Sequence, residues 1–515
     1  MSKIQHRSLH LLIVFLLGWL VIISINIGLT TKIRANDLLK VATEPAFPPF
    51  EMLAQNSREL EGFDIDLFKA IGEEAGFTVQ FESLPFDGLI PALQAGTVDA
   101  AISGMTITAE RAQTVDFSRP YFQSGLALAI RKDNDTIQSF YDLADKKVAV
   151  QIGTTGAQEA QKISGAEIVT FDNMALALQE LNNGGVDAVV NDAPVTLYAI
   201  KSSNLDNLEV VGKLLTEEYY GIALPKTSIN LDKVNNALDI LIKNGTYREI
   251  YQKWFAGEPA KLPLVPPALE GEKATTFDYQ RLFINLVWGA LVTVMLTAFS
   301  VLFGTIGGTF LAIASISPYS FLRWLSKIYV DFFRGTPLLV QIFMIYFGLP
   351  SLFQQLGMDF NFERLPAAIA ALSLNSAAYL AEIIRGGIQS IEQGQWEASQ
   401  SLGLGSVQTL RYIIFPQALR RMLPPLGNEF ITLLKDTSLV AVIGFEDLFR
   451  QGQLMVATTY RAFEIYAAVA LVYLVLTFFA SRVFAWLEKR MNPLNQAPQK
   501  ASLNLGDHQE LIVNN

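Results

Sequence analysis

Long runs without a charged residue constrain this chain more than any other feature of its sequence. Leu282 to Leu322 is uncharged for 41 residues, and Gly335 to Met358 is uncharged for 24. Two further runs, Leu365 to Ala381 and Ile465 to Ser481, each extend for 17 residues. A helix of about 20 apolar residues crosses a bilayer with its backbone polar groups paired internally. The second half of the chain is therefore predicted to span a membrane.

A further, weaker span is predicted near residues 422–445, where Glu429, Lys435 and Asp436 interrupt an apolar segment. Lys435 and Asp436 are interpreted either as an ion pair inside the membrane or as residues at its edge, and both alternatives stay open. Pro318 predicts that the longest run forms one helix followed by a turn. The sequence thus predicts an all-α domain of about five membrane-spanning helices.

The distribution of basic residues predicts the orientation of these helices. Loops rich in lysine and arginine remain on the cytoplasmic side of a membrane. With an odd number of spans, the residues before 276 are then expected on the opposite side. The basic residues lie in alternate loops and after the last span: Arg323, Lys327, Arg385, Arg411, Arg420, Arg421, Arg482, Lys489 and Arg490.

The N-terminal segment, residues 1–35, also predicts export of the domain that comes after it in the chain. Two basic residues precede residues 11–31, which carry no charge. This pattern is typical of a signal peptide, and the length of the apolar run also suits a retained membrane anchor, so both alternatives stay open. Residues 257–275 are rich in proline and predict an extended linker, whereas residues 493–515 predict a disordered tail.

Residues 36–256 have the composition of a soluble α/β domain, in which short β-rich runs alternate with amphipathic helical stretches. Such alternation predicts parallel sheets built from βαβ units. The pattern occurs twice, as LQAGTVDAAISG at 93–104 and as LNNGGVDAVVND at 181–192, which predicts two similar lobes. The predicted lobes are lobe 1, about residues 37–126 and 224–256, and lobe 2, about residues 127–223.

Composition and residue usage exclude several other classes of function. The net charge of −10 argues against a nucleic-acid-binding protein, which needs a basic surface to meet phosphates. The chain has no cysteine, and its histidines are His6, His10 and His508, all close to its two ends. A Ser-His-Asp triad, a cysteine nucleophile or a histidine metal cluster therefore cannot be built in its body. We expect no catalytic residue and no metal site.

Residues of the predicted lobes suit a small zwitterion. Arg111 can form paired hydrogen bonds with a carboxylate, and Thr106 can supply a hydroxyl nearby. Thr108 is a plausible N-cap, which would place Arg111 in the first turn of a helix. Residues 153–156, Gly-Thr-Thr-Gly, join a predicted strand to a helix, where backbone N–H groups favour an anion. Asp192 ends another predicted strand and can accept hydrogen bonds from an ammonium group.

Five segments, in matching order and spacing, resemble the polar amino-acid binding proteins of bacterial ABC importers. The resemblance implies a two-lobed α/β fold of the type II periplasmic-binding-protein class that closes on a free L-amino acid. It assigns the α-carboxylate to Arg111, Thr106 and Thr155, and the α-amino group to Asp192 and the carbonyl of Gly104. The segments are ATEPAFPPFE (42–51), EGFDIDL (61–67), SGMTITAERAQTVDFSRPY (103–121), VAVQIGTTGAQ (148–158) and VVNDAPV (189–195).

The same resemblance concerns the walls and the side-chain end of the pocket. Phe47 and Phe86 are expected to pack on the apolar stem of the ligand. Glu44 takes a place where relatives often have aspartate, whereas Gln151 departs from the lysine that some glutamine-binding relatives carry. A carboxylate at position 44 favours an amide or a cation. Glutamine, histidine or a basic amino acid is therefore expected ahead of glutamate.

Residues 397–416, EASQSLGLGSVQTLRYIIFP, resemble the EAA loop of bacterial ABC importer permeases. FFRGTPLLVQ at 332–341 and NSAAYLAEIIRGGIQS at 375–390 resemble the polar amino-acid permeases in particular. The resemblance covers about residues 276–492 and implies a loop that contacts an ATPase, with Ser399 and Phe415 in place of the family's alanine and leucine. The coupling residues that it implies are Glu397, Ala398, Gly403 and Pro416.

Three of these residues carry expectations about local structure. Glu397 is expected to begin a short cytoplasmic helix that fits a groove of the partner. Gly403 is expected to end this helix, and Pro416 to stop the segment before the next span.

The resemblance predicts the substrate-binding and membrane-spanning subunit of an importer for polar amino acids, in a bacterial inner membrane with the lobes outside. Gly212-Lys213 is the one Gly-Lys pair and lacks the P-loop spacing, so ATP and Mg are expected on separate ABC ATPase subunits, with no cofactor in this chain. About five helices are too few for a complete pathway in this family, so a homodimer is expected. The alternative is a ligand-gated channel of the bacterial glutamate-receptor type, which would need a pore between the lobes.

Overall fold

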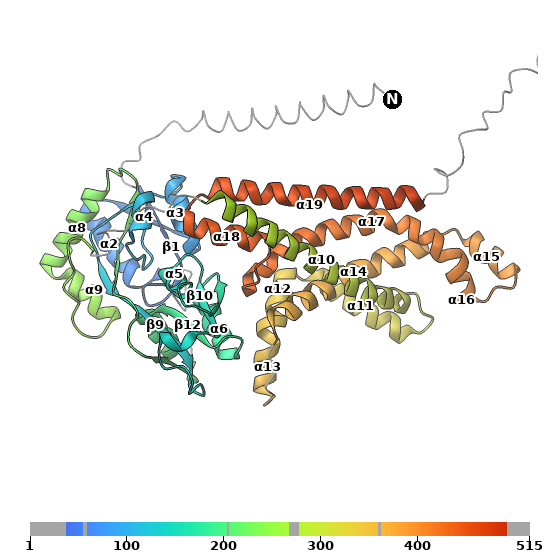
Figure 1. Ribbon diagram of the computed structural model, residues 1–515, viewed down its shortest axis with the longest axis horizontal. Helices are drawn as coiled ribbons and strands as arrows, with labels where there is room; N and C mark the ends of the chain where they lie inside the picture. Colours follow the sequence, from blue (N-terminus) through green and yellow to red (C-terminus); the bar gives the residue numbers. More distant parts are fainter. Residues whose placement is uncertain (1–37, 55–58, 203–204, 267–277, 359–361, 492–515) are drawn as a thin grey trace, which may run out of the picture.

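The computed structural model describes residues 38–54, 59–202, 205–266, 278–358 and 362–491. Its first half forms a mixed α/β body, from which long helices of the second half extend (Figure 1). The predicted signal or anchor (1–35) and the predicted tail (493–515) lie outside the described residues, as do residues 267–275 of the predicted linker.

Lobe 1 is built on a sheet with the strand order β5-β1-β6-β15-β7. β1 runs parallel to β5 and β6, whereas β15 pairs antiparallel with β6 and β7. The strands are β1 (Leu38–Thr43), β5 (Thr78–Ser83), β6 (Ala100–Ala101), β7 (Val115–Phe117) and β15 (Ala223–Pro225). The helices are α2 (Phe63–Ala75), α3 (Phe86–Gln94), α4 (Ala109–Thr114), α8 (Leu231–Asn244) and α9 (Thr246–Trp254).

Lobe 2 repeats this plan with the strand order β11-β10-β12-β9-β13. β10 runs parallel to β11 and β12, and β9 pairs antiparallel with β12 and β13. The strands are β9 (Leu126–Arg131), β10 (Lys147–Gln151), β11 (Glu167–Phe171), β12 (Ala188–Asp192) and β13 (Leu208–Val211). The helices are α5 (Thr155–Ala160), α6 (Met174–Asn183) and α7 (Ala193–Ser202), besides the short helix η1 (Phe140–Leu143).

Two paired strands, β8 (Phe122–Ser124) and β14 (Glu218–Tyr220), carry the chain between the lobes. Leu126 already pairs in the sheet of lobe 2, and Ala223 already pairs in the sheet of lobe 1, each within one residue of the approximate boundaries given above. A small sheet completes lobe 1: β2 (Ala46–Phe47), β3 (Glu51–Leu53) and β4 (Leu60–Glu61).

Helices are the only regular elements among the described residues of the second half. Its longest helix packs on α14 through glycines: a Cβ on Gly308 would lie 2.9 Å from the carbonyl oxygen of Ala377, so only glycine permits this approach. The helices are α10 (Tyr279–Ser315), α11 (Ser320–Gly335), α12 (Leu338–Phe343), η3 (Met344–Gly348), α13 (Leu349–Gln355), α14 (Arg364–Gln389), α15 (Gln393–Ser401), α16 (Ser406–Thr409), η4 (Leu410–Ile414), α17 (Phe415–Asp436), η5 (Thr437–Ile443), α18 (Leu448–Thr459) and α19 (Ala462–Met491).

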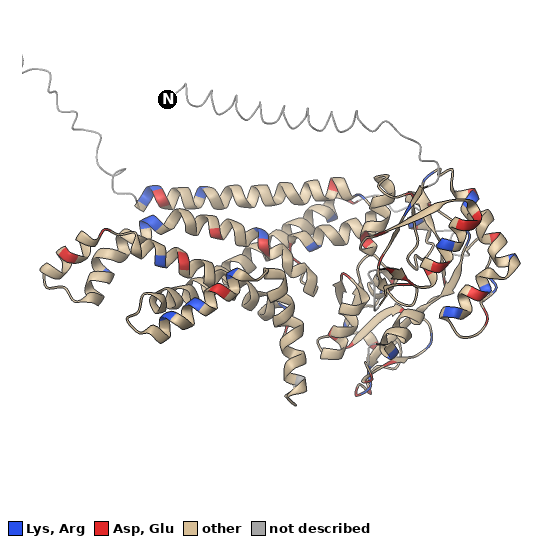
Figure 2. Ribbon diagram, turned by 180° about the vertical axis from the view of Figure 1, so that it is seen from behind, with Lys and Arg blue, Asp and Glu red and all other residues tan. Residues whose placement is uncertain are grey.

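Three described helices, α10, α14 and α19, are long and apolar enough to cross a membrane, and the bent pair α11 and α12–α13 raises the number to four. Figure 2 shows α19 without charge between its two charged ends. The weak predicted span coincides largely with α17, which carries Arg420, Arg421 and Glu429 and ends at Asp436. As predicted, a turn that contains Pro318 follows α10.

The segment that resembles the EAA loop departs from two predictions. Glu397 lies inside α15, because the backbone of Glu392 is extended and the helix begins directly after it. Pro416 does not stop the helix, since residues 406–436 are continuously helical. In the π-turn η4, the Phe415 N–H donates to the carbonyl of Leu410, five residues earlier. This wider turn accommodates Pro416, which has no N–H to donate. The prediction for Gly403 is confirmed: it follows α15 with a φ of 79°, a conformation that favours glycine.

Candidate functional site

A narrow cavity lies between the two lobes, at the ends of strands from both sheets, and its space for the centre of a water molecule is about 10 Å³. All of the predicted ligand residues except Glu44 line it. Its lining residues are Phe47, Phe86, Gly104, Thr106, Arg111, Gln151, Thr154, Thr155 and Asp192. The fold thus brings together residues that are up to 145 positions apart in the sequence, from Phe47 to Asp192.

Arg111 is held rigidly at one end of the cavity. The prediction for Thr108 is confirmed: it caps α4 and accepts a hydrogen bond of 3.2 Å from the Arg111 N–H. The guanidinium donates to the carbonyl of Thr106 in lobe 1 (2.7 Å) and to that of Gly153 in lobe 2 (2.9 Å), and lies over the ring of Phe86. Arg111 is 1% exposed and forms no ion pair among the described residues. It is a buried cation that an anionic ligand would neutralise.

The two threonines assigned to the ligand carboxylate share a protein partner instead. The hydroxyls of Thr106 and Thr155 donate to the same oxygen of Glu218, at 2.6 and 2.9 Å. Glu218 is buried and lies on β14, between the lobes. Its role was not predicted from the sequence, where Glu217 and Glu218 stand side by side and nothing local marks the second as buried. Glu218 ties lobe 1 to lobe 2 beside Arg111.

Asp192 lies at the end of β12 and is buried. The hydroxyls of Tyr220 and Ser124 both donate to its Oδ1. Burial raises the pKa of Asp192 above its ordinary value, and the nearby carboxylate of Glu218 raises it further. An ammonium group in the cavity would stabilise the ionised form of Asp192 and relieve this cost.

The other end of the cavity is acidic. Glu44 lies behind Gln151, whose amide donates to both carboxylate oxygens of Glu44, at 2.9 and 2.8 Å. Burial raises the pKa of Glu44 to about 8, and the carboxylates of Asp87 and Asp172 act in the same direction. A cationic or amide side chain suits this end, and a further carboxylate does not. No group of three or more His, Cys, Asp or Glu in the described part of the chain is arranged to hold a metal ion.

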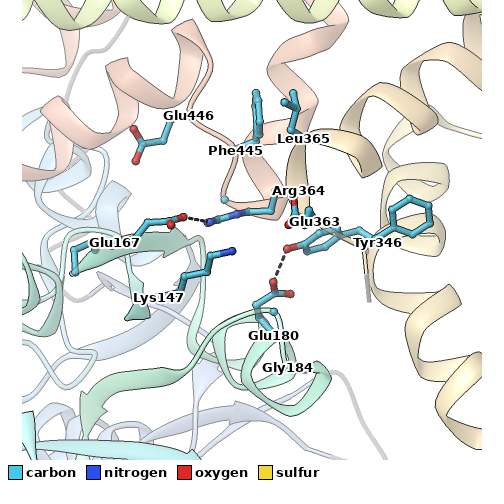
Figure 3. A pocket seen from close by; sticks show the side chains of 14 residues that line it. Lys147, Glu167, Glu180, Gly184, Tyr346, Glu363, Arg364, Leu365, Phe445 and Glu446 are labelled. Atoms are coloured by element: carbon cyan, nitrogen blue, oxygen red, sulfur yellow. Dashed lines mark hydrogen bonds and ion pairs between the residues drawn. The ribbon is translucent and has the colours of Figure 1, made fainter. Parts of the chain in front are cut away.

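Polar contacts join lobe 2 to the helical half. Arg364, at the start of α14, forms an ion pair of 2.5 Å with Glu167, and the Tyr346 hydroxyl donates to Glu180. Figure 3 shows both side chains reaching from the helical half toward lobe 2 around a shared cavity. Arg450 of α18 reaches Asp172 of lobe 2 in the same way. These three residues were not predicted from the sequence, because nothing local marks a contact between segments so far apart.

The α15 segment lies at the end of the helical half that is far from the lobes (Figure 1). Glu397 and Ala398 are exposed, whereas Ser399 is buried. Three large apolar side chains near them, Leu402, Val407 and Tyr412, are each more than half exposed, at 80%, 78% and 62%. Exposed apolar side chains rimmed by polar residues are typical of a surface that contacts another protein.

The lobes and cavity define a small-molecule-binding domain, and the helical half defines a membrane domain. Residues 39–257 match the family of bacterial extracellular solute-binding proteins, family 3, and residues 304–493 match the binding-protein-dependent transport system inner membrane component. The chain belongs to the second family and carries a domain of the first at its N-terminal side. It therefore joins the binding and permease domains of amino-acid ABC transporters and is not an enzyme, and no comparison supports the channel alternative.

The curated relatives of this chain match its helical half. A probable amino-acid permease protein, YxeN of Bacillus subtilis, is 42% identical over 220 residues, which cover 42% of this chain and 97% of the relative. The glutamine transport system permease protein GlnP of Escherichia coli is 42% identical over 213 residues, covering 41% and 94%. Among solved structures, an ancestral arginine-binding protein bound to arginine is 48% identical over 42% of this chain and 98% of its own, with a TM-score of 0.42.

Proposed function

We propose that this chain captures a polar amino acid outside a bacterial inner membrane and passes it through its own permease domain, as half of a homodimer driven by two separate ABC ATPase subunits. The observation that carries the proposal is that one narrow cavity is lined both by Arg111, a buried cation without an ionic partner among the described residues, and by Asp192. These two groups complement the carboxylate and the ammonium of an amino acid. ATP and Mg would be bound by the ATPase and not by this chain.

The proposed substrate class is glutamine, histidine or a basic amino acid, with a basic amino acid favoured. The carboxyls of Asp87 and Asp172 act electrostatically on that of Glu44, and Gln151, which lines the cavity, donates to Glu44. Arg450 already pairs with Asp172, so the relevant group is the carboxyl of Glu44: a cationic side chain would favour its ionised form, and a glutamate side chain would disfavour it. The relative GlnP is named for glutamine transport, which agrees with an amide as the second choice.

Calorimetric titration of the full chain in detergent, with each common amino acid in turn, tests the proposal. We expect binding of basic amino acids, weaker binding of glutamine and no measurable binding of glutamate. Asp192→Asn is expected to weaken binding of every ligand by roughly tenfold or more, because a hydrogen bond to a charged group is lost. Failure of every amino acid to bind would contradict the proposed function.

The raised pKa of Glu44 predicts a pH dependence that differs between ligands. In the ligand-free protein the carboxyl of Glu44 binds a proton below its pKa of about 8. A cationic ligand side chain favours the ionised form, so its binding releases this proton and the affinity for arginine rises as the pH rises to about 8, then levels off. The affinity for glutamine should rise less over the same range.

Titration of arginine in two buffers of different ionisation enthalpy measures the released proton. Glu44→Gln is expected to abolish this proton release. It should also make the pH dependence of affinity the same for arginine and glutamine. Equal pH dependence for arginine and glutamine in the unmodified chain would show that Glu44 does not sense the ligand side chain.

A further inference from the structure

Helix α18 of the permease domain lies against the binding lobes and contacts both of them. It packs against α3 of lobe 1 (Figure 1), and Ala457 approaches Gly153 of lobe 2 so closely that a Cβ on Gly153 would lie 3.5 Å from the Cβ of Ala457. The same added Cβ would lie 3.5 Å from Asp87 of α3. The helix therefore crosses the seam between the lobes next to Gly153, whose carbonyl accepts from Arg111.

Arg450 fixes the first turn of α18 to lobe 2. Its guanidinium donates to Asp172 at 2.5 Å and to the carbonyl and hydroxyl of Thr170 at 2.6 and 3.2 Å. The side chain is fully buried, and its positive charge opposes the rise that burial causes in the pKa of Asp87 in lobe 1. A buried arginine that pairs with lobe 2 and acts electrostatically on a carboxyl of lobe 1 is a strong anchor, because its removal leaves Asp172 without its ionic partner.

Tyr460 follows the last turn of α18 and enters lobe 1. It is 6% exposed and belongs to the same apolar cluster as Leu89, Ile90 and Phe86. Its backbone is left-handed, with a φ of 57°, and its N–H caps the helix at Val456. A bulky residue in this conformation is strained, and such strain is found where a side chain must be aimed at a site.

The hydroxyl of Tyr460 is buried beside Arg111, whose guanidinium interacts with its oxygen, and no acceptor for its proton lies within hydrogen-bond distance among the described residues. Burial raises the pKa of this hydroxyl, while the positive charge of Arg111 opposes the rise. The group therefore stays protonated and can donate. A buried donor without an acceptor costs free energy, and a carboxylate bound to Arg111 would bring an acceptor within its reach.

We propose that Tyr460 is a ligand-binding residue supplied by the permease domain: its hydroxyl donates to the α-carboxylate that Arg111 holds, and Arg450 is the positioning residue that keeps α18 across the two lobes. The inference rests on the proposed function, since it needs an amino acid in the cavity. Because Tyr460 acts on the carboxylate common to all amino acids, it changes affinity without changing the preference among side chains.

Titration of the full chain with arginine and with glutamine tests this assignment. Tyr460→Phe is expected to weaken both ligands equally, by roughly tenfold, because it removes one hydrogen bond to a charged group. Arg450→Gln is expected to weaken both, and Arg450→Lys to restore part of the loss. Tyr346→Phe and Arg364→Gln are the matched controls, because each removes a polar contact between the domains away from the cleft, and both should bind as the unmodified chain does.

The outcomes separate the two proposals. If the unmodified chain binds no amino acid, the proposed function fails. The assignment of Tyr460 is overturned, while the proposed function stands, if the unmodified chain binds and Tyr460→Phe binds equally well or more tightly. The same holds if the control variants lose as much affinity as Tyr460→Phe and Arg450→Gln.

Discussion

Arg111→Ala is expected to abolish amino-acid binding, with a loss of affinity of roughly a hundredfold or more, because a paired charge-assisted contact disappears. The effect exceeds that of an exposed arginine because Arg111 is 1% exposed and has no other ionic partner among the described residues. The ligand carboxylate would then lie in a buried cavity without compensating charge. The loss should be the same for arginine and glutamine.

The measurement is calorimetric titration of the full chain, and Arg248→Ala serves as its control. Arg248 also lies in lobe 1, where it forms an exposed ion pair with Glu258. An exposed pair contributes little to stability, so this variant should bind as the unmodified chain does. Retention of affinity in Arg111→Ala would remove the central assignment of the site.

Glu397→Lys is expected to reduce ATP-driven uptake by roughly tenfold or more while amino-acid binding stays unchanged, because a reversed charge at a protein–protein contact opposes the partner. Glu397 lies exposed on α15 and accepts a hydrogen bond of 2.9 Å from Gln393 within the same helix, so its replacement disturbs no buried contact. The lobes that bind the ligand lie at the opposite end of the molecule (Figure 1).

Uptake into vesicles that hold the full chain and its ATPase measures this effect, and calorimetry on the same preparation measures binding. Glu488→Lys is the matched control, since it reverses a charge on the exposed last turns of α19. Normal uptake by Glu397→Lys, or an equal loss in Glu488→Lys, would contradict a specific role of α15 in coupling.

The local pattern of the chain was enough to predict much of its structure. Strands β10 and β12 form where strands were predicted, before residues 153–156 and at Asp192, and three of the four uncharged runs become α10, α14 and α19. Thr108 caps its helix and Gly403 ends another, because caps depend on a few neighbouring residues. Glu397 and Pro416 were predicted less well, since a helix start depends on backbone conformation and a π-turn can accommodate a proline.

The sequence by itself determined which residues could meet a zwitterion and which segments could cross a membrane, because charge, hydropathy and capping are local properties. The tertiary structure alone decided that Glu218 holds the two threonines, that Gln151 stands between Glu44 and the cavity, and that Tyr460 lies beside Arg111. Residues 111 and 460 are far apart in the sequence, and no periodicity relates them. Their proximity results from packing between domains, where buried apolar surface and a buried arginine fix positions that no local pattern specifies.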